Sequence, residues 1–476
     1  MNKKKNLLFY ILMMVVFGAI IYWILKRGQA LEKSGIIANS IAAEHAPAKH
    51  NSLQVFMDSF NHNLSHPLPV LLLQIIIIVL CTRFFGVVFN KIGQPAVIGE
   101  IVAGIVLGPS LLGLFFPGIS QFIFPVDSLN NLQFLSQVGL ILFMFVIGME
   151  VDISVIRKQA YDAVIISHAS IIIPYTLGMG LSFFLYQQFA PQHISFLAFA
   201  LFMGIAMSIT AFPVLARIIQ ERGITKTKLG VMALTCAASD DVTAWCILAV
   251  LIAIIKAGSS VSALFTIGLV IFYIAIMLIV VRPVLQKLYI VYEKNKMMSK
   301  AMMAIVFILL LLSAYATETI GIHALFGSFM AGMIMPQDSS FRKIIIDKIE
   351  DISIVLLLPL FFVFTGLRTQ IGLLNQGFLW AACGWILLVA VVGKFGGSAI
   401  AAKVVGQTWK NSLSIGALMN TRGLMELIVL NIGYDLGILS PEIFAMMVLM
   451  ALITTFMTNP ALNFINWLMP DARYKV

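Results

Sequence analysis

Charged residues are scarce in this sequence. Asp, Glu, Lys and Arg together make up 11% of its 476 residues, whereas a soluble domain carries about 25%. Hydrophobic residues make up 60% of the chain, and no polar segment is long enough to form a separate soluble domain. These proportions exclude a soluble globular protein and predict an all-α polytopic membrane protein.

Cysteine is also rare, with four residues that all lie inside apolar runs. Their spacing matches no metal-ligand pattern and indicates no disulfide framework, so we interpret them as small packing residues. The sequence likewise lacks a metal triad, a Ser/His/Asp spacing and an extramembrane catalytic domain. We therefore expect no enzymatic activity and no cofactor.

Lys and Arg outnumber Asp and Glu, which gives a net charge of +10. No nucleic-acid partner is needed to explain this excess, because the basic residues of membrane proteins collect in cytoplasmic loops. When successive loops are placed on alternate sides of the bilayer, most basic residues fall on the side of the N-terminus. The asymmetry predicts an odd number of core spans and cytoplasmic N- and C-termini, in a cell membrane that we expect to be a bacterial inner membrane.

The chain is expected to have four parts. Residues 1–26 form either a membrane anchor or a signal peptide. The anchor is favoured because no small-x-small cleavage site follows this segment. Residues 27–66 form a polar extracytoplasmic linker, whose histidines lack the spacing of a metal site. A transmembrane domain at 67–468 is followed by a short cytoplasmic tail at 469–476. The domain holds about thirteen apolar spans, near 67–90, 95–113, 129–149, 160–186, 194–219, 228–255, 260–281, 300–317, 321–335, 346–367, 376–402, 411–433 and 441–468.

A faint internal repeat relates the two halves of the transmembrane domain. Residues 142–149 resemble residues 360–367, and each segment follows a short span that has an Ala-Gly step near a proline. Each also precedes an apolar span that polar residues interrupt, at 208–213 and at 420–423. In the expected topology, corresponding spans of the two halves cross the membrane in opposite directions, so the repeat is inverted. Inverted repeats with one interrupted helix in each half, crossing at the site, are the usual build of a secondary transporter.

The first interruption contains Pro213, which lacks an amide hydrogen and clashes with the preceding helical turn. The helix is expected to open near Thr210. Backbone carbonyls freed there, together with the hydroxyls of Ser208 and Thr210, can bind a cation. A kinked packing helix, in which the hydroxyls repair the kink, is the alternative for this segment taken alone.

The second interruption contains Asn420, Thr421 and Arg422. Arg422 precedes Glu426 by four residues, so their side chains can pair on one helix face. An arginine barely releases its proton and is a poor proton carrier. We therefore expect Arg422 and Glu426, with Asn420 and Thr421, to have a structural or gating role at this break.

Asp240 and Asp241 lie about halfway along a run that is otherwise apolar, near the middle of the membrane. Each carboxylate at that depth costs about 2.5–3.5 kcal/mol to insert. Neighbouring residues on a helix point about 100° apart, so one aspartate can face the ion path while the other faces a counter-charge. Lys394, which also lies in mid-span, is the best counter-charge. Burial favours the neutral forms of such a pair and pairing favours the charged forms, so the pair can exchange protons. A purely structural ion pair is the alternative.

Three motifs carry a resemblance to a known family. They are ASDDVTAW at 238–245, IHALFG at 322–327 and MNTRGLMEL at 419–427. They resemble the signatures of monovalent cation:proton antiporters of the second superfamily branch, especially plant-type cation/H+ exchangers and their bacterial relatives. The likeness covers residues 67–468.

The resemblance implies a function and roles for the central residues. Asp241 is expected to bind either the monovalent cation or a proton, and Asp240 is expected to pair with Lys394 as a coupled proton site. The resemblance further implies alternating access by a rigid core and assembly as a homodimer in the lipid bilayer.

Two other transport functions are alternatives to antiport. A cation channel or uniporter conducts without moving protons and has no need of a buried titratable pair. A sodium-coupled organic anion symporter on a similar fold binds its anion at helix N-termini, a site that adjacent aspartates disfavour. The sequence does not choose between Na+, K+ and Li+, because side-chain identity alone does not fix the size of an ion site.

Overall fold

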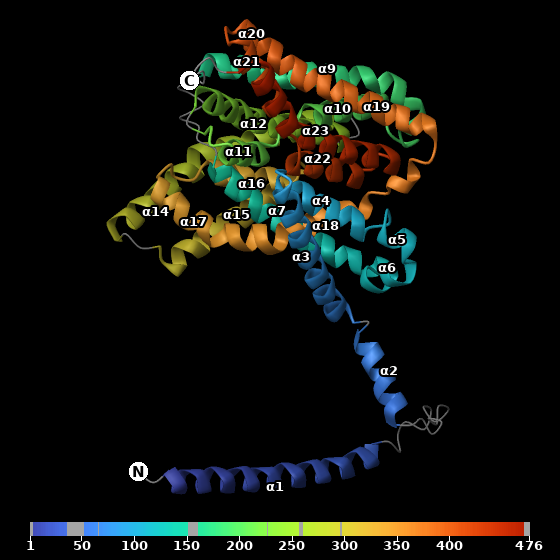
Figure 1. Ribbon diagram of the computed structural model, residues 1–476. Helices are drawn as coiled ribbons and strands as arrows, with labels where there is room; N and C mark the ends of the chain where they lie inside the picture. The colour runs from blue at the N-terminus through green and yellow to red at the C-terminus, as the bar shows by residue number, and fades with distance from the viewer. Residues whose placement is uncertain are drawn as a thin grey trace. The chain divides into compact units, whose positions relative to one another are not determined.

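The computed structural model describes residues 3–35, 52–64, 66–150, 160–225, 227–256, 260–295 and 298–470. Within these ranges the regular structure is helical and contains no β-strand, which confirms the all-α class (Figure 1). Residues 36–51 of the predicted linker, and all but the first two residues of the predicted tail, lie outside the described ranges. The chain divides into two compact units, residues 1–66 and residues 67–476, which are described separately.

The first unit contains helices α1 (Lys3–Gly35) and α2 (Ser52–Leu64) among its described residues. α1 carries the apolar run of the predicted anchor, and its large hydrophobic side chains between Ile11 and Leu25 are exposed. A helix that is hydrophobic all round suits a lipid environment. α1 continues past residue 26, where the anchor was predicted to end, and α2 lies within the stretch predicted as a polar linker.

The second unit is built from helices that fill the predicted transmembrane domain. In chain order they are α3 (Pro67–Lys91), α4 (Ala96–Leu107), α5 (Leu112–Phe115), α6 (Pro117–Ile123), α7 (Leu129–Glu150), α9 (Ala160–Phe189), α10 (Phe196–Ser208), α11 (Phe212–Glu221), α12 (Lys228–Lys256), α13 (Ser260–Ile276), α14 (Arg282–Asn295), α15 (Lys300–Ile320), α16 (Ala324–Met333), α17 (Ser339–Ile352), α18 (Leu358–Arg368), α19 (Gly377–Val391), α20 (Gly397–Val404), α21 (Trp409–Met419), α22 (Leu424–Asp435) and α23 (Pro441–Leu468).

Many of these helices are long enough to cross a membrane. In the described residues, 11 helical segments are long and apolar enough to cross a membrane, and the pair α21 and α22, bent by 42°, makes a twelfth. The apolar helix α16 is shorter. Each apolar run predicted between residues 67 and 468 coincides with one of these helices or with a joined pair. The polytopic architecture is therefore confirmed, while the count of thirteen spans stays a prediction.

Two prolines, one just after an apolar run and one inside another, do not end the helix. The run predicted at 260–281 continues into α14 through a π-helical turn at Met277–Val281, just before Pro283. A proline clashes with the carbonyl four residues earlier, and the wider π turn makes room for it. The same arrangement recurs at Pro359, where a π turn at Ser353–Leu357 joins α17 to α18.

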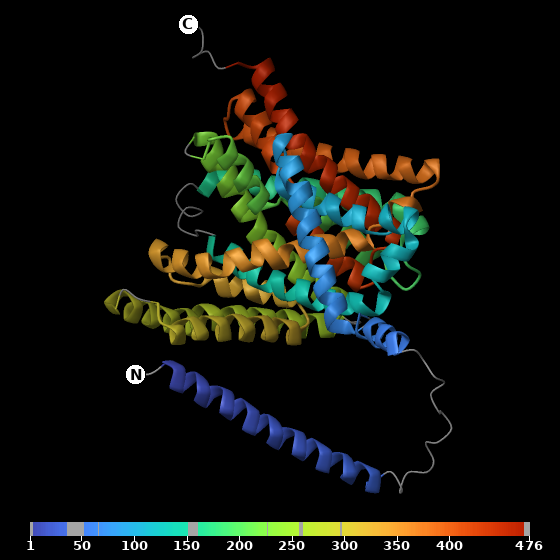
Figure 2. The same cartoon turned by 60° about the horizontal axis from the view of Figure 1, so that its bottom comes forward.

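The helices of the second unit pack as two groups (Figures 1 and 2). The core group comprises α9 to α12 and α19 to α23, and α12 contacts α9, α10, α11 and α21 within it. The support group comprises α3, α4, α7 and α15 to α18, with α7 packed against α16 and α18. The two groups meet where α18 contacts α22 and where α4 contacts α23. All the residues predicted to form the ion site belong to the core group.

Glycines let helices of the support group pack backbone to backbone. A Cβ atom added to Gly366 of α18 would lie 2.2 Å from the carbonyl carbon of Gly104 in α4. One added to Gly332 of α16 would lie 2.1 Å from the carbonyl oxygen of Phe145 in α7. Thus the Ala-Gly step of each half packs against the repeated segment of the other half, as a two-fold repeat would arrange them. The inverted repeat itself stays a prediction.

We expect Gly366→Ala to lower the melting temperature of the detergent-solubilised protein by several degrees, because α4 and α18 must separate to admit the methyl group. Gly384→Ala in α19 is the matched control, since a Cβ atom there meets nothing within 4 Å. It should melt at the same temperature as the parent or slightly higher, because alanine is favoured over glycine in a helix by about 1 kcal/mol. Equal melting of the two variants would contradict the close approach at Gly366.

Candidate ion-binding site

Asp240 and Lys394 form an ion pair in the interior of the core group. Asp240 lies on α12, Lys394 lies between α19 and α20, and both side chains are fully buried. The Lys394 Nζ atom lies 3.0 Å from Oδ2 of Asp240. Lys394 belongs to a π-helical turn at Val392–Gly396, a feature that often marks functional positions in helices.

Hydroxyl groups from two other helical segments complete the surroundings of Asp240. Ser167 on α9 donates to Oδ1 at 2.6 Å, and Ser170, one turn later, donates to Oδ2 at 2.5 Å. Thr210, in the break between α10 and α11, donates to Oδ2 at 2.8 Å. The carboxylate therefore accepts three hydroxyl hydrogen bonds besides the ion pair with Lys394.

The ammonium group of Lys394 is fully used as a donor. Its Nζ atom donates to the carbonyl oxygen of Ser170 at 2.9 Å, to the carbonyl oxygen of Ser208 and to Asp240. An ammonium group has three donors, so these acceptors satisfy it. Ser208 contributes through its backbone, because its own hydroxyl donates to the carbonyl of Ile205 at 2.9 Å. The predicted opening of this helix thus supplies a carbonyl to Lys394.

Asp241 differs from its neighbour in having no hydrogen-bond partner among the residues that the structure describes. Its side chain is fully buried, and among the described residues neither carboxylate oxygen accepts a hydrogen bond. The Thr210 hydroxyl, which was predicted to help bind a cation, donates to Asp240. An ionised carboxylate buried without a partner is strongly unfavourable, so this position favours either a bound cation or a bound proton.

Arg422 holds the two broken helices together. Its buried guanidinium donates to the carbonyl oxygens of Ala206 at 2.9 Å and Met207 at 2.6 Å, at the end of α10. It also pairs with Glu426 at 3.0 Å. A cation at a helix C-terminus is favoured by the helix dipole and satisfies carbonyls that lack intrahelical partners. The predicted pairing of Arg422 with Glu426 is present, and Arg422 in addition caps α10.

The two breaks also touch through their backbones. The amide of Ala211 donates to the carbonyl of Thr421 at 3.0 Å. On α23, Thr455 accepts from the amide of Arg422 at 3.1 Å and donates to the carbonyl of the same residue at 2.7 Å. Thr421 is within 3.1 Å of Thr458, while the side-chain oxygen of Asn420 has no partner among the described residues. These contacts fix the position of the second break in the core group.

Pro213 is the second residue of α11, and α10 ends five residues before it at Ser208. Three non-helical residues, 209 to 211, separate the two helices, and the first and last of them have extended backbone. This is the opening predicted from the position of the proline, and it places Thr210 beside Asp240.

The formal charges buried at the two breaks do not cancel. Asp240 is balanced by Lys394, and Arg422 is balanced by Glu426. Asp241 is the additional carboxylate, and in its ionised form it gives the cluster one negative charge. One monovalent cation or one proton restores neutrality, whereas a divalent cation would leave an excess positive charge.

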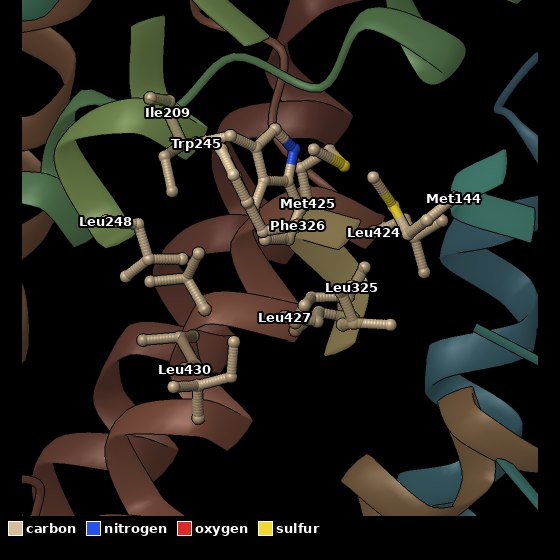
Figure 3. Close-up of a cluster of buried hydrophobic side chains, with 14 of the residues drawn as sticks. Met144, Ile209, Trp245, Leu248, Leu325, Phe326, Leu424, Met425, Leu427 and Leu430 are labelled. Atoms are coloured by element: carbon tan, nitrogen blue, oxygen red, sulfur yellow. The ribbon is translucent and has the colours of Figure 1, made fainter. Parts of the chain in front are cut away.

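An apolar cluster lies at the boundary between the two helix groups. Trp245 follows Asp241 by one helical turn on α12, and its ring stacks on Phe329 of α16 with centroids 6.4 Å apart. Figure 3 shows side chains from α12, α16 and α22 gathered here, with Ile209 from the first break among them. The labelled residues are Met144, Ile209, Trp245, Leu248, Leu325, Phe326, Leu424, Met425, Leu427 and Leu430. Such a cluster excludes water between the core and support groups near the breaks.

Comparison with known proteins places these observations in a family context. The model for the family "Sodium/hydrogen exchanger, transmembrane" matches residues 55–464. The Na(+)/H(+) antiporter NhaS4 of Synechocystis sp. is 42% identical over 397 residues, which make up 83% of this chain and 97% of that relative. The K(+)/H(+) antiporter 1 of Saccharomyces cerevisiae is 33% identical over 413 residues, which make up 85% of this chain and 47% of the yeast protein.

The relatives differ in length. The Cation/H(+) antiporter 17 of Arabidopsis thaliana is 40% identical over 419 residues, 87% of this chain and 50% of the plant protein. The chain therefore spans about half the length of the plant and yeast relatives, and nearly the whole of the cyanobacterial one. Among solved structures, the sodium proton antiporter MjNhaP1 from Methanocaldococcus jannaschii at pH 8 has a TM-score of 0.60 and 16% identity, covering 85% of this chain and 98% of that one. At this identity the likeness concerns the fold.

Proposed function

Because the chain belongs to the sodium/hydrogen exchanger transmembrane family, we propose that it exchanges a monovalent cation, Na+ or K+, for protons by alternating access. Asp241 is the proposed carrier, and the Asp240–Lys394 pair is the proposed coupled proton site. The observation that carries this proposal is the buried Asp241 carboxylate, which has no partner among the described residues while the four charges around it are paired.

Competition between the cation and the proton for Asp241 couples cation transport to proton transport. The carboxylate binds either a cation or a proton, because each neutralises the same single charge. Cation binding displaces the proton of Asp241 and also a proton from the Asp240–Lys394 pair, because a positive charge nearby disfavours the protonated form of the pair. Ser167, Ser170, Thr210 and the Ser208 carbonyl hold that pair in place.

Two hollows at the boundary of the helix groups support alternating access. One, with a volume of about 20 Å³, is lined by α7, α16, α18 and the end of α22, including Asp435. The other, with a volume of about 410 Å³, is lined by the α3–α4 connection, the end of α11 and α23 at Asn459. α23 runs from Pro441, near the end of α22, to Asn459, a rise of about 27 Å at 1.5 Å per residue. The hollow at Asp435 therefore lies near the start of α23 and the hollow at Asn459 lies further along it, with the apolar cluster available to close the path between them.

The proposed setting is a bacterial inner membrane, with both termini in the cytoplasm, as the distribution of basic residues predicts. A homodimer is proposed from the family resemblance. Reconstitution in vesicles of known orientation, followed by protease access to tags at each terminus, tests the topology.

A cation panel in proteoliposomes tests the function. We expect Na+ or K+ added outside the vesicles to collapse an imposed pH gradient, as followed by a pH-sensitive dye, and empty liposomes to be unaffected. Steady cation currents under voltage clamp that do not depend on a pH gradient would instead identify a channel and reject antiport. The ion that acts at the lowest concentration identifies the substrate.

A further inference from the structure

The smaller hollow is lined by both polar and apolar side chains. Amide, hydroxyl and carboxylate groups come from α7 and α22, and the apolar lining includes Ile428 and Leu325, which belongs to the apolar cluster of Figure 3. The polar lining residues are Gln133, Ser136, Gln137, His323, Asn431 and Asp435. α22 has 12 residues, so the hollow mouth at Asp435 lies about 18 Å along the helix from the second break.

An ion pair crosses the boundary of the two helix groups at this mouth. Arg368, at the end of α18 in the support group, places Nη1 2.6 Å from Oδ1 of Asp435, at the end of α22 in the core group. The same nitrogen lies 3.3 Å from the side-chain oxygen of Asn431. The guanidinium also lies over the ring of Phe364, 4.2 Å from its centroid, so α18 holds it in place.

A second polar contact joins the same helices one turn deeper. The Asn431 side-chain amide donates to the hydroxyl of Thr365 on α18 at 2.8 Å and to the carbonyl of Leu427 on its own helix at 2.9 Å. Asn431 therefore contacts the support group twice: its side-chain nitrogen contacts Thr365, and its side-chain oxygen contacts Arg368. Together these contacts fasten α22 to α18 on the side of the smaller hollow.

We propose that the smaller hollow is a cation entrance and that Arg368 is the gate residue that closes it by pairing with Asp435. The inference rests on the proposed exchange function and adds a gate to it. The guanidinium occupies the position beside the Asp435 carboxylate and the Asn431 oxygen that a hydrated monovalent cation takes when the helix groups separate. The Arg368 and Asp435 side chains are 19% and 37% exposed, and such partly exposed pairs are weak and screened by salt. That weakness suits a contact that breaks in every transport cycle.

A labelling experiment tests the gate without relying on transport. Gln137→Cys places a reporter thiol in the hollow, on a background in which the exposed Cys246 is replaced by serine. We expect Arg368→Gln to raise the rate at which a membrane-impermeant maleimide labels the reporter by at least several fold. Arg217→Gln is the matched control, because Arg217 pairs with Glu221 four residues away on the same helix. That pair does not connect the core group with the support group. The control should leave the labelling rate unchanged.

The charge-swapped variant Arg368→Asp/Asp435→Arg separates loss of the gate from damage to the fold. It restores an ion pair across the same boundary, so we expect slow labelling to return. An unchanged labelling rate in a folded Arg368→Gln variant would overturn the gate, whatever ion the protein carries. Conversely, faster labelling in a protein that shows no cation-dependent proton movement would support the gate while rejecting the proposed exchange.

Discussion

Asp241→Asn should abolish cation-dependent proton movement and leave the protein folded. Asparagine has nearly the same volume as aspartate but can be neither ionised nor protonated, so neither ion has a charge to neutralise. The parent carboxylate makes no hydrogen bond with the described residues, and its replacement therefore breaks none of the described contacts. We expect the melting temperature to be unchanged or raised, because a buried charge without a partner is removed.

Everted membrane vesicles with a fluorescent pH indicator provide the measurement. The signal on addition of Na+ or K+ should fall to that of vesicles lacking the protein. Asp351→Asn is the matched control, since it makes the same replacement at an exposed position on α17, away from both hollows. It should retain the parent activity. Cation-dependent proton movement that persists in a folded Asp241→Asn variant would reject Asp241 as the carrier.

The charged residues of the site could be found from sequence because apolar surroundings make them conspicuous. A charge in the middle of a membrane span needs a partner, and the chain offers few candidates. This reasoning selected Lys394 as the counter-charge for one of the two aspartates, the family resemblance assigned it to Asp240, and helical spacing selected Glu426 for Arg422; both contacts are present. The same approach predicted the opening near Thr210 from Pro213, because the effect of a proline on a helix is local.

The hydroxyl and backbone partners could not be found in this way. Ser167 and Ser170 are one turn apart on α9, but serine is also an ordinary packing residue between membrane helices. Their role depends on α9 lying against α12, which is a tertiary contact. Thr455 likewise acquires its role because α23 passes the second break. Serines and threonines one turn apart in otherwise apolar helices were the available signal.

Backbone carbonyls were expected at the first break, but their partners were not. The sequence led to a cation-binding role for the opened carbonyls and for the Ser208 hydroxyl. In the structure the carbonyl of Ser208 accepts from Lys394, and those of Ala206 and Met207 accept from Arg422. Two cationic side chains from distant segments thus meet the C-terminal end of α10. Local sequence around α10 contains no information about which charges approach it.

Removal of the Asp240–Lys394 pair should change how the membrane potential acts on exchange. Lys394→Ala alone leaves a buried carboxylate without its counter-charge, which typically destabilises a protein by about 3–5 kcal/mol, so we expect poor folding of this single variant. The double variant Asp240→Asn/Lys394→Gln removes both charges and retains groups that can hydrogen-bond with Ser167, Ser170 and Thr210. We expect it to fold and to retain exchange through Asp241.

The number of protons exchanged for each cation decides the role of the pair. If both Asp241 and the pair release protons, two protons exchange for one cation and one net charge crosses the membrane. A potential of 100 mV then contributes about 2.3 kcal/mol to each cycle, and the parent protein should run faster when the potential favours that movement. The double variant exchanges one proton through Asp241, so its rate in proteoliposomes should no longer follow the imposed potential. If the parent and the double variant show the same voltage dependence, Lys394 and Asp240 form a structural ion pair and Asp241 alone carries the exchange.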